Sequence, residues 1–192
     1  MATQPVALLT EEEYLRIEQS AKFKSEFVGG KMFAMAGGTM RHARLTARTQ
    51  AQLEDQLEGT HCRSFSSDAR VLTPDTGDQF YPDVSVVCGP TVTHAGSSDI
   101  MTNPVLLVEV LSPSTADYDR GLKFELYRQI PTLRDYLAIH CKSVFVEHWS
   151  RQSDGTWNPR EYRGVDASIP LPNIGCELHL RKLYQGVMDE PD

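Results

Sequence analysis

The sequence predicts an α/β domain in which a mixed central β-sheet is flanked by helices. Short apolar runs such as 105–111 indicate buried strands, whereas the stretch 39–58 contains no glycine or proline and indicates a long helix. The segments follow one another as helix, hairpin, long helix, strands, helix and strands, an order typical of such folds. A chain of 192 residues suits one domain. We expect that domain to span residues 8–187, with flexible termini at 1–7 and 188–192.

The first predicted elements carry clear local signals. Thr10 and Glu13 form the two ends of a capping box, so a helix is expected to begin there and to continue to about residue 19. The segment 26–35 is predicted to be a β-hairpin, because Gly29–Gly30 supplies the positive φ angles of a two-residue turn. The chain is therefore expected to open with an N-terminal helix followed by a hairpin.

The long helix is expected to end before Gly59, since glycine commonly follows a helix. Its predicted inward face is a stripe at near-helical spacing, formed by Ala43, Ala47, Ala51, Leu45, Leu53 and Leu57. Arg41, Arg44 and Arg48 are three and four residues apart and share another face. Together with His42, Arg41 and Arg44 are candidates for contacts to nucleic-acid phosphates. The alternatives are a solvated charged face for the arginines and an ordinary hydrogen-bonded histidine.

The rest of the chain is predicted to be mainly strands. The expected strands are 62–65, 70–72, 83–87, 105–111, 134–140, 143–149, 157–162 and 174–180, of which the first two are separate strands or one bent strand. The stretch 89–103 is rich in Gly, Ser and Thr and is expected to be a mobile loop. A helix is expected from Thr115 or Asp117 to about Gln129. The alternating strand 143–149 is expected to form a sheet edge or the surface of a homodimer.

The composition of the chain excludes some classes of protein and favours others. A net charge of −7 argues against indiscriminate tight binding to nucleic acids, and no apolar run reaches the roughly 18 residues that a membrane-spanning helix needs. The N-terminus lacks the basic start and apolar core of a secretion signal, which favours a cytoplasmic protein. The four cysteines are Cys62, Cys88, Cys141 and Cys176. Because they include no CxxC pair, we expect reduced, buried thiols rather than a zinc site or a reactive thiol.

One predicted buried strand contains a carboxylate. The apolar run 105–111 is interrupted only by Glu109, which is costly to bury without a partner. Asp83 opens another apolar run and is expected on a neighbouring strand. Two adjacent carboxylates repel each other unless a cation lies between them, and a hard cation such as Mg²⁺ suits oxygen ligands. Together with Lys123 on the following helix, these residues predict a metal-dependent phosphodiesterase site.

The same residues carry a resemblance to a nuclease superfamily. Pro82-Asp83 followed by Glu109 on a buried strand resembles the D…(D/E)xK pattern of the PD-(D/E)XK, or restriction-endonuclease-like, nucleases. Within it, the chain from about residue 8 to 187 is similar to the Uma-two family. The likeness is carried by Glu11-Glu12, Tyr14-Leu15, Glu26–Lys31, Arg41-His42, Tyr81–Val84, Val108–Thr115, Lys123–Tyr127 and Arg134–Tyr136. Leu111 stands where the motif has its lysine, and the resemblance gives that role to Lys123.

The resemblance implies a restriction-endonuclease-like core and an endonuclease that hydrolyses DNA phosphodiester bonds. We expect it to work as a homodimer, because cutting both strands in one encounter needs two active sites. In this assignment Asp83 and Glu109 bind Mg²⁺ or Mn²⁺, with the backbone carbonyl of Val110 as a third ligand. Lys123 positions or activates the water that attacks the phosphorus, and the metal lowers the pKa of that water. The resemblance implies that Glu26 is a further acidic member of the site.

Each residue of this constellation also has a structural interpretation. Asp83 is alternatively a turn cap, a frequent role of aspartate. Glu109 is alternatively one half of a buried ion pair with Lys123 or Arg120 that needs no metal. Lys123 is alternatively a surface residue whose ammonium lies in water. Under these interpretations the chain is a catalytically silent binding or assembly module, in which the acids and the lysine form a structural charge network.

Overall fold

The computed structural model describes residues 8–35, 37–112 and 115–191, so the predicted flexible lead at 1–7 lies outside the described residues. In chain order the elements are α1 (Glu11–Ser20), β1 (Ser25–Val28), β2 (Lys31–Ala34), α2 (Met40–Leu57), β3 (Cys62–Ser66), β4 (Arg70–Leu72), β5 (Gln79–Phe80), β6 (Val84–Cys88), β7 (Ile100–Met101), β8 (Leu106–Leu111), α3 (Ala116–Tyr118), η1 (Asp119–Lys123), α4 (Phe124–Tyr127), β9 (Asp135–His140), β10 (Phe145–Arg151), β11 (Trp157–Arg163), β12 (Ser168–Leu171), β13 (Cys176–His179) and α5 (Leu180–Leu183).

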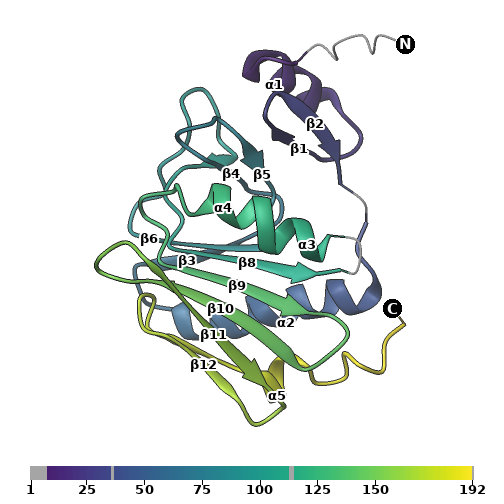
Figure 1. The fold of residues 1–192 in the computed structure, drawn as a ribbon, viewed down its shortest axis with the longest axis vertical. Helices are drawn as coiled ribbons and strands as arrows, with labels where there is room; N and C mark the ends of the chain where they lie inside the picture. The colour runs from purple at the N-terminus through teal and green to yellow at the C-terminus, as the bar shows by residue number, and fades with distance from the viewer. Residues whose placement is uncertain (1–7, 36, 113–114, 192) are drawn as a thin grey trace.

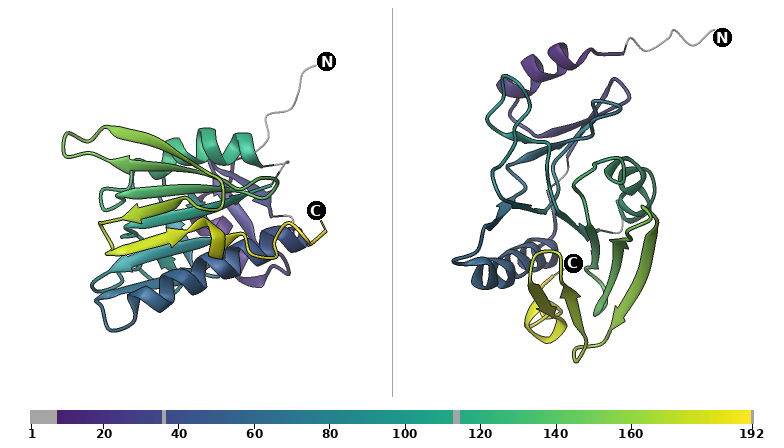
Figure 2. Two further views of the ribbon diagram at one scale, coloured as in Figure 1. Left: turned by 90° about the horizontal axis from the view of Figure 1, so that it is seen from below. Right: turned by 90° about the vertical axis from the view of Figure 1, so that its left-hand side faces the viewer.

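The main layer is a six-stranded mixed sheet with the order β11-β10-β9-β8-β6-β3. Its strands β8 and β9 are parallel, whereas the other neighbours are antiparallel. Helices α3 and α4 cover one face of this sheet, and α2 lies on the opposite face (Figures 1 and 2). The predicted α/β class, with a mixed sheet between helices, is confirmed. In the described residues no helix combines the length and the apolar character needed to cross a bilayer.

Strand β8 separates two apolar cores. Leu107 and Leu111 belong to the core under α4, whereas Leu106, Val108 and Val110 belong to the core that α2 and the β12–β13 hairpin cover. All six residues of β8 are buried, as a strand with helices on both faces requires. Because side chains alternate along a strand, the remaining residue of β8, Glu109, lies on the α4 face. Strand β8 thus places its one carboxylate in the interior.

The N-terminal elements form a smaller unit at one end of the molecule (Figure 1). The capping box of α1 is present: Glu13 N–H donates to Thr10 Oγ1 at 3.2 Å, and Thr10 N–H donates to the Glu13 carboxylate at 2.8 Å. The β1–β2 hairpin turns at Gly29 and Gly30, whose φ angles are 55° and 77°. Both predictions are confirmed. The hairpin joins the five-stranded sheet β2-β1-β5-β4-β7, and buries Glu26 of β1.

Helix α2 confirms the predicted long helix, and Gly59 follows its C-cap with φ 77°. Its buried stripe differs from the prediction: the buried residues are Leu45, Thr49, Leu53 and Leu57, whereas Ala43, Ala47 and Ala51 are exposed. The physical reason is size, because leucine removes more apolar surface from water than alanine does. The helix therefore rotates its leucine side toward the sheet.

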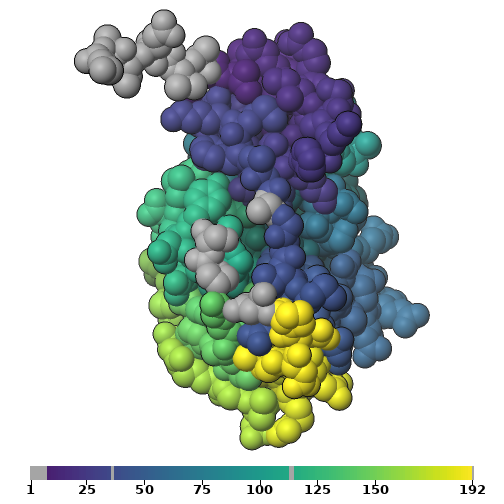
Figure 3. Space-filling view, turned by 90° about the vertical axis from the view of Figure 1, so that its right-hand side faces the viewer, coloured from purple at the N-terminus to yellow at the C-terminus, as the bar shows by residue number. Residues whose placement is uncertain are grey.

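The basic face of α2 lies against the end of the chain. Arg41 Nε donates to the Glu190 carbonyl at 2.7 Å, and Arg44 Nη1 lies 3.4 Å from the Glu190 carboxylate. Arg48 Nη1 donates to the Lys182 carbonyl at 2.9 Å. Figure 3 shows the C-terminal segment beside the start of α2. The three arginines share a face as predicted, and part of their hydrogen-bonding capacity is used within the chain.

Three sequence predictions are corrected by the topology. The strand predicted at 143–149 is no sheet edge, because β10 pairs with β9 on one side and with β11 on the other. The stretch predicted as the loop 89–103 contains β7, which pairs with β4. Strand β12 was not predicted, although it pairs with β13 in a hairpin. Alternation and composition describe a single strand, whereas these features depend on which strands become neighbours.

Two of the four cysteines are bonded to each other. Cys62 of β3 and Cys88 of β6 form a disulfide, which corrects the expectation that all four are reduced. Cys141 and Cys176 are buried and take no part in a disulfide. The pairing follows from the sheet, since Cys62 and Cys88 are directly opposite each other in the β3–β6 ladder. A spacing of 26 residues gives no hint of this in the sequence.

Candidate active site

Lys123 lies among three carboxylates. Its Nζ is 2.7 Å from Glu26 Oε1, 2.8 Å from Glu109 Oε1 and 3.7 Å from Asp119 Oδ1. These acids come from β1, β8 and η1, so three separate segments meet at one ammonium. The exposed fraction of all four side chains is between 5% and 7%. The buried glutamate on β8 therefore has the partner that its position demands.

Asp83 lies beside Glu109 because strands β6 and β8 pair. Val84, the next residue after Asp83, is directly opposite Val108 in the ladder. The Asp83 carboxylate accepts a hydrogen bond of 2.7 Å from the amide of Val110. His42 Nε2, from the first turn of α2, is 3.2 Å from the same carboxylate. Asp83 thus connects the acidic cluster around Lys123 to the beginning of α2.

A kinked helical segment carries Asp119 and Lys123. The single helix predicted from Thr115 or Asp117 to Gln129 is instead divided into α3, η1 and α4, and Gly121 within η1 departs from helical values, with φ −97° and ψ −105°. The segment therefore consists of two helical stretches joined by a kink at Gly121. Asp119 and Lys123 are both buried, four residues apart.

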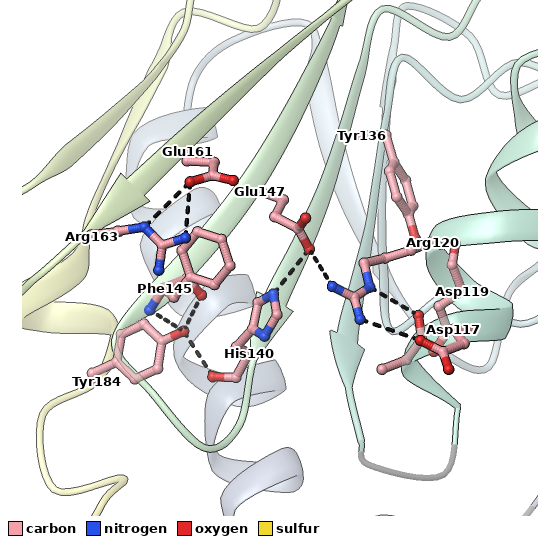
Figure 4. Close-up of polar contacts among 11 residues, drawn as sticks. Asp117, Asp119, Arg120, Tyr136, His140, Phe145, Glu147, Glu161, Arg163 and Tyr184 are labelled. Carbon is pink, nitrogen blue, oxygen red and sulfur yellow. Dashed lines mark hydrogen bonds and ion pairs between the residues drawn. The ribbon is translucent and has the colours of Figure 1, made fainter.

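Arg120 fastens the same helical segment to the sheet. Its guanidinium lies 3.4 Å from Asp117 and 3.5 Å from Glu147 of β10, and His140 of β9 is 2.9 Å from the same Glu147 carboxylate (Figure 4). Of the two alternative ion-pair partners named for Glu109, Lys123 makes the contact, whereas Arg120 pairs with Glu147. Tyr136 adds a hydrogen bond of 3.0 Å from its hydroxyl to the Asp119 carbonyl. These contacts fix η1 over β9 and β10.

Two tyrosines orient the acids. Tyr127 donates its hydroxyl proton to Glu109 Oε1 at 2.8 Å, and Tyr118 donates to Glu26 Oε2 at 3.3 Å. Tyr127 is completely buried, so its hydroxyl has little freedom to turn elsewhere. Each glutamate therefore receives one hydrogen bond from a tyrosine and one contact from Lys123, which limits the rotation of both carboxylates.

The site holds more negative than positive charge. Burial raises the pKa of Glu109 well above its ordinary value, and the neighbouring acids add to the rise while Lys123 opposes it. Burial also raises the pKa of Asp119. For Lys123, burial lowers the pKa, but Glu109, Glu26 and Asp119 outweigh it and raise the pKa well above the usual range. A cluster of this kind attracts a further cation.

The side of the site at Asp83 and His42 is the more open one. The side chains of Asp83 and His42 are 14% and 21% exposed, against at most 7% for the residues around Lys123. Burial lowers the pKa of His42, but the hydrogen bond and charge of Asp83 outweigh it, so the pKa is raised. Asp83 and His42 thus form the part of the cluster nearest to solvent.

A comparison with models of protein families shows which family the chain belongs to. The family model described as "Uma2: Putative restriction endonuclease" matches residues 11–181. The chain belongs to the Uma2 family. Two proteins of Synechocystis, both named as uncharacterized, are similar over most of their length. The protein slr1290 is 36% identical over 183 residues, 95% of each chain, and sll1609 is 36% identical over 169 residues, 88% of this chain and 96% of that one.

A solved structure shares the fold of this Uma2 chain. The crystal structure titled a "putative nuclease belonging to DUF820", from Anabaena variabilis, superposes with a TM-score of 0.76 and covers 92% of this chain and 97% of its own. The two sequences are 16% identical, so the likeness concerns the fold. Together with the family match, it confirms the predicted restriction-endonuclease-like core and the predicted family.

Most of the predicted site residues converge in this Uma2 chain, and two do not. Glu26 and Glu109 contact Lys123 directly, Asp83 joins them through the amide of Val110, and His42 borders Asp83. Arg41 and Arg44 contact the C-terminal segment instead. Sequence reasoning missed Asp119 and Tyr118. The sequence does contain a signal for Asp119 as a member of the site, because it precedes Lys123 by four residues and so shares its helix face. Tyr118 had none, since its contact with Glu26 joins distant segments.

Proposed function

We propose that the protein is a divalent-metal-dependent endonuclease that hydrolyses phosphodiester bonds in DNA. The observation that carries this proposal is the meeting of Asp83 and Glu109, from adjacent strands, with Lys123 from the following helical segment. Metal-assisted hydrolysis of phosphodiesters uses such carboxylates together with a nearby positive charge. Membership of the Uma2 family and the fold shared with the Anabaena structure support the same reaction class.

The residues of the site fit a hard divalent cation. Asp83 and Glu109 offer oxygen ligands, and Mg²⁺ is usually held by one or two carboxylates together with waters and substrate phosphates. The buried acids outnumber the single ammonium, so another positive charge would relieve their repulsion. The backbone carbonyl of Val110 is our candidate for a third protein ligand. When bound, Mg²⁺ or Mn²⁺ would supply a Lewis acid and a water of lowered pKa.

Lys123 acts in this proposal as a fixed positive charge. Its raised pKa keeps the ammonium protonated at neutral pH, so Lys123 donates protons in hydrogen bonds and does not remove one from water. From this position it orients the attacking water and stabilises the negative charge that develops on the phosphate. Burial strengthens this effect, because charges interact more strongly where water is excluded.

Three neighbours position the reacting groups. Glu26 holds Lys123 together with Glu109, since its carboxylate is 2.7 Å from Nζ. Tyr127 fixes Glu109 through its 2.8 Å hydrogen bond. His42 borders Asp83 on the more open side, where its raised pKa favours a positive charge beside an approaching phosphate. We therefore assign His42 to the substrate interface and Glu26 and Tyr127 to positioning.

DNA as substrate and a homodimer as the working form complete the proposal. One active site cuts one strand at a time, so two copies are the simplest arrangement for cutting a duplex. A net charge of −7 predicts modest affinity that falls steeply with salt. Arg41 and Arg44 remain candidates for phosphate contacts. Each guanidinium has five N–H donors, and the contacts with the C-terminal segment use only some of them.

A plasmid-nicking assay tests the proposed function. Supercoiled DNA is incubated with wild type, with Glu109→Gln and with Glu161→Gln, a matched control on the exposed strand β11. We expect Mg²⁺-dependent nicking by wild type and by the control, loss of nicking in EDTA, and a decrease of at least about 100-fold for Glu109→Gln, equivalent to several kcal/mol of transition-state stabilisation. Equal nicking by all three proteins would assign the activity to a contaminant.

The competing proposal is a silent module that keeps the charge network for structure. It predicts no nicking by any variant under any metal condition. A calorimetric titration with Mg²⁺ or Mn²⁺ then separates the two, because a metal-dependent nuclease shows a binding heat that Asp83→Asn removes. A titration without any site-specific heat in the wild type would favour the silent module.

A further inference from the structure

A second cluster of metal-ligand residues lies at the β3 edge of the main sheet. His61, Cys62 and Cys88 each offer a ligand atom, and these atoms lie within 4.8 Å of one another. No other three His, Cys, Asp or Glu side chains in the described ranges form such a set. Cys88 is five residues beyond Asp83 along β6, about 16 Å in an extended strand. The cluster is therefore separate from the acidic site.

The strand register brings the two sulfur atoms together. Cys62 of β3 and Cys88 of β6 are directly opposite each other, and the Gly89 amide donates to the His61 carbonyl at 2.8 Å beside them. This bonding pattern makes them a non-hydrogen-bonded pair, the type in which opposing side chains lie closest. Strand β3 is an outer strand of its sheet, and His61 is exposed. The cluster therefore reaches solvent through His61, whereas Cys62 is buried and Cys88 is half-buried.

We propose that the reduced protein binds one divalent cation of the Zn²⁺ type through His61, Cys62 and Cys88. Two thiolates and an imidazole are the ligands that Zn²⁺ prefers, and a fourth position is left for water or a carboxylate. A pocket of about 670 Å³ next to Cys62 is lined by Glu54, Asp55 and Glu58 among others. Their negative charge raises the local concentration of cations.

The disulfide and the metal compete for the same two sulfur atoms. Opening the disulfide consumes two electrons: two small-molecule thiols are oxidised to one disulfide, and Cys62 and Cys88 become two protein thiols. Metal binding then displaces both thiol protons into solvent. The oxidised protein has no thiolate to offer at this edge, so the site exists only after reduction.

A cobalt titration tests the proposal, with Co²⁺ as the spectroscopic stand-in for Zn²⁺. Protein is reduced, freed of reductant without oxygen and titrated with Co²⁺. We expect one ion per chain with the near-ultraviolet absorption of a sulfur-to-cobalt charge transfer, displaced by Zn²⁺ and absent from the oxidised protein. Cys88→Ala should abolish the band. His61→Ala should weaken Co²⁺ binding by at least about tenfold. Replacing a residue that only hydrogen-bonds to a metal ligand already lowers metal affinity that much, and His61 is itself a proposed ligand.

Two controls keep the result specific. Cys176→Ala removes a buried thiol elsewhere and should leave the absorption band unchanged. Glu109→Gln should also leave it unchanged, because cobalt bound to carboxylates gives no sulfur-to-cobalt band. His61 is exposed, so its replacement tests the site even when Cys88→Ala fails to fold. Absence of the band from reduced wild type, its survival in folded Cys88→Ala, or unchanged affinity in His61→Ala would overturn the proposal. None of these outcomes bears on the nuclease site.

Discussion

The six-stranded sheet buries a cluster of ionisable side chains on each face, and the two clusters differ in how many donors meet each acid. On the face toward α2, the Asp135 carboxylate accepts hydrogen bonds from His148 Nε2 at 2.7 Å and from Asn173 Nδ2 at 2.8 Å. One acid is thus met by two donors, and the Asp135 and His148 side chains are 1% and 5% exposed. On the face toward α4, three acids lie within 3.7 Å of the single ammonium of Lys123.

The difference shows what distinguishes a candidate active site from a structural cluster. Burial is common to both, so burial alone decides nothing. Both carboxylate oxygens of Asp135 are satisfied within the protein, and the hydrogen bond from Asn173 joins the loop between β12 and β13 to the sheet. The Lys123 cluster has an excess of acids and a more open side at Asp83. Excess charge together with access is what favours an ion and a substrate.

Lys123→Met should have the largest effect of any single change. It leaves Glu26, Glu109 and Asp119 without their cation, so the free energy of unfolding should fall by about 3–5 kcal/mol and nicking should be lost. Urea unfolding measures the first effect. Lys31→Met on the exposed part of β2 is the control and should stay within about 0.5 kcal/mol. Equal stability of the two variants would show that the acids do not depend on Lys123.

Metal binding should stabilise one cluster and leave the other unaffected. At a Mg²⁺ concentration 100 times Kd, we expect wild type to gain about 2.7 kcal/mol of stability, visible as a higher midpoint in urea. Asp83→Asn should lose this gain, whereas Asp135→Asn should retain it. A gain that survives in Asp83→Asn would place the ion elsewhere in the protein.

Asp135→Asn should destabilise the protein without affecting catalysis. Removing the charge that pairs with His148 and Asn173 leaves buried donors poorly satisfied, which costs about 1–3 kcal/mol. Nicking per folded molecule should equal that of wild type, and urea titration with an activity assay in parallel measures both. If activity instead falls as strongly as in Glu109→Gln, the two faces are not separate in function.

Tyr127→Phe should give the smallest of these effects. The change removes only the 2.8 Å hydrogen bond to Glu109 and keeps the buried ring, so the free energy of unfolding should fall by about 1 kcal/mol. Nicking should decrease but persist, because Glu109 is retained and only its orientation is loosened. A complete loss of nicking with an unchanged urea midpoint would instead place the Tyr127 hydroxyl among the reacting groups.

The local elements of this fold could be predicted from the sequence because their signals are local. The Thr10–Glu13 capping box and the Gly29–Gly30 turn each depend on residues within a few positions, and both are present. The charged residue in β8 was also informative, since a buried glutamate demands a partner, and Lys123 is that partner. These features do not depend on which strands become neighbours.

The remaining features depend on tertiary pairing. Alternation in β10 fits an edge strand and an internal one equally, and only the neighbours β9 and β11 decide. The Cys62–Cys88 disulfide depends on the β3–β6 register. The break at Gly121 accompanies the turn of Asp119 and Lys123 toward the sheet, a tertiary demand that helix propensity does not contain. Helical periodicity over 115–129 therefore predicted one unbroken helix, whereas the structure has a kink at Gly121.

The most direct test of the proposed active site is a crystal of the protein soaked in Mn²⁺, examined by anomalous diffraction. We predict one anomalous peak from an Mn²⁺ ion that carboxylate oxygens of Asp83 and Glu109 bind jointly. The peak should be absent from a crystal of Asp83→Asn. A soaked crystal with no peak at these two residues, while Lys123 keeps its contacts with Glu26 and Glu109, would contradict the metal-dependent site.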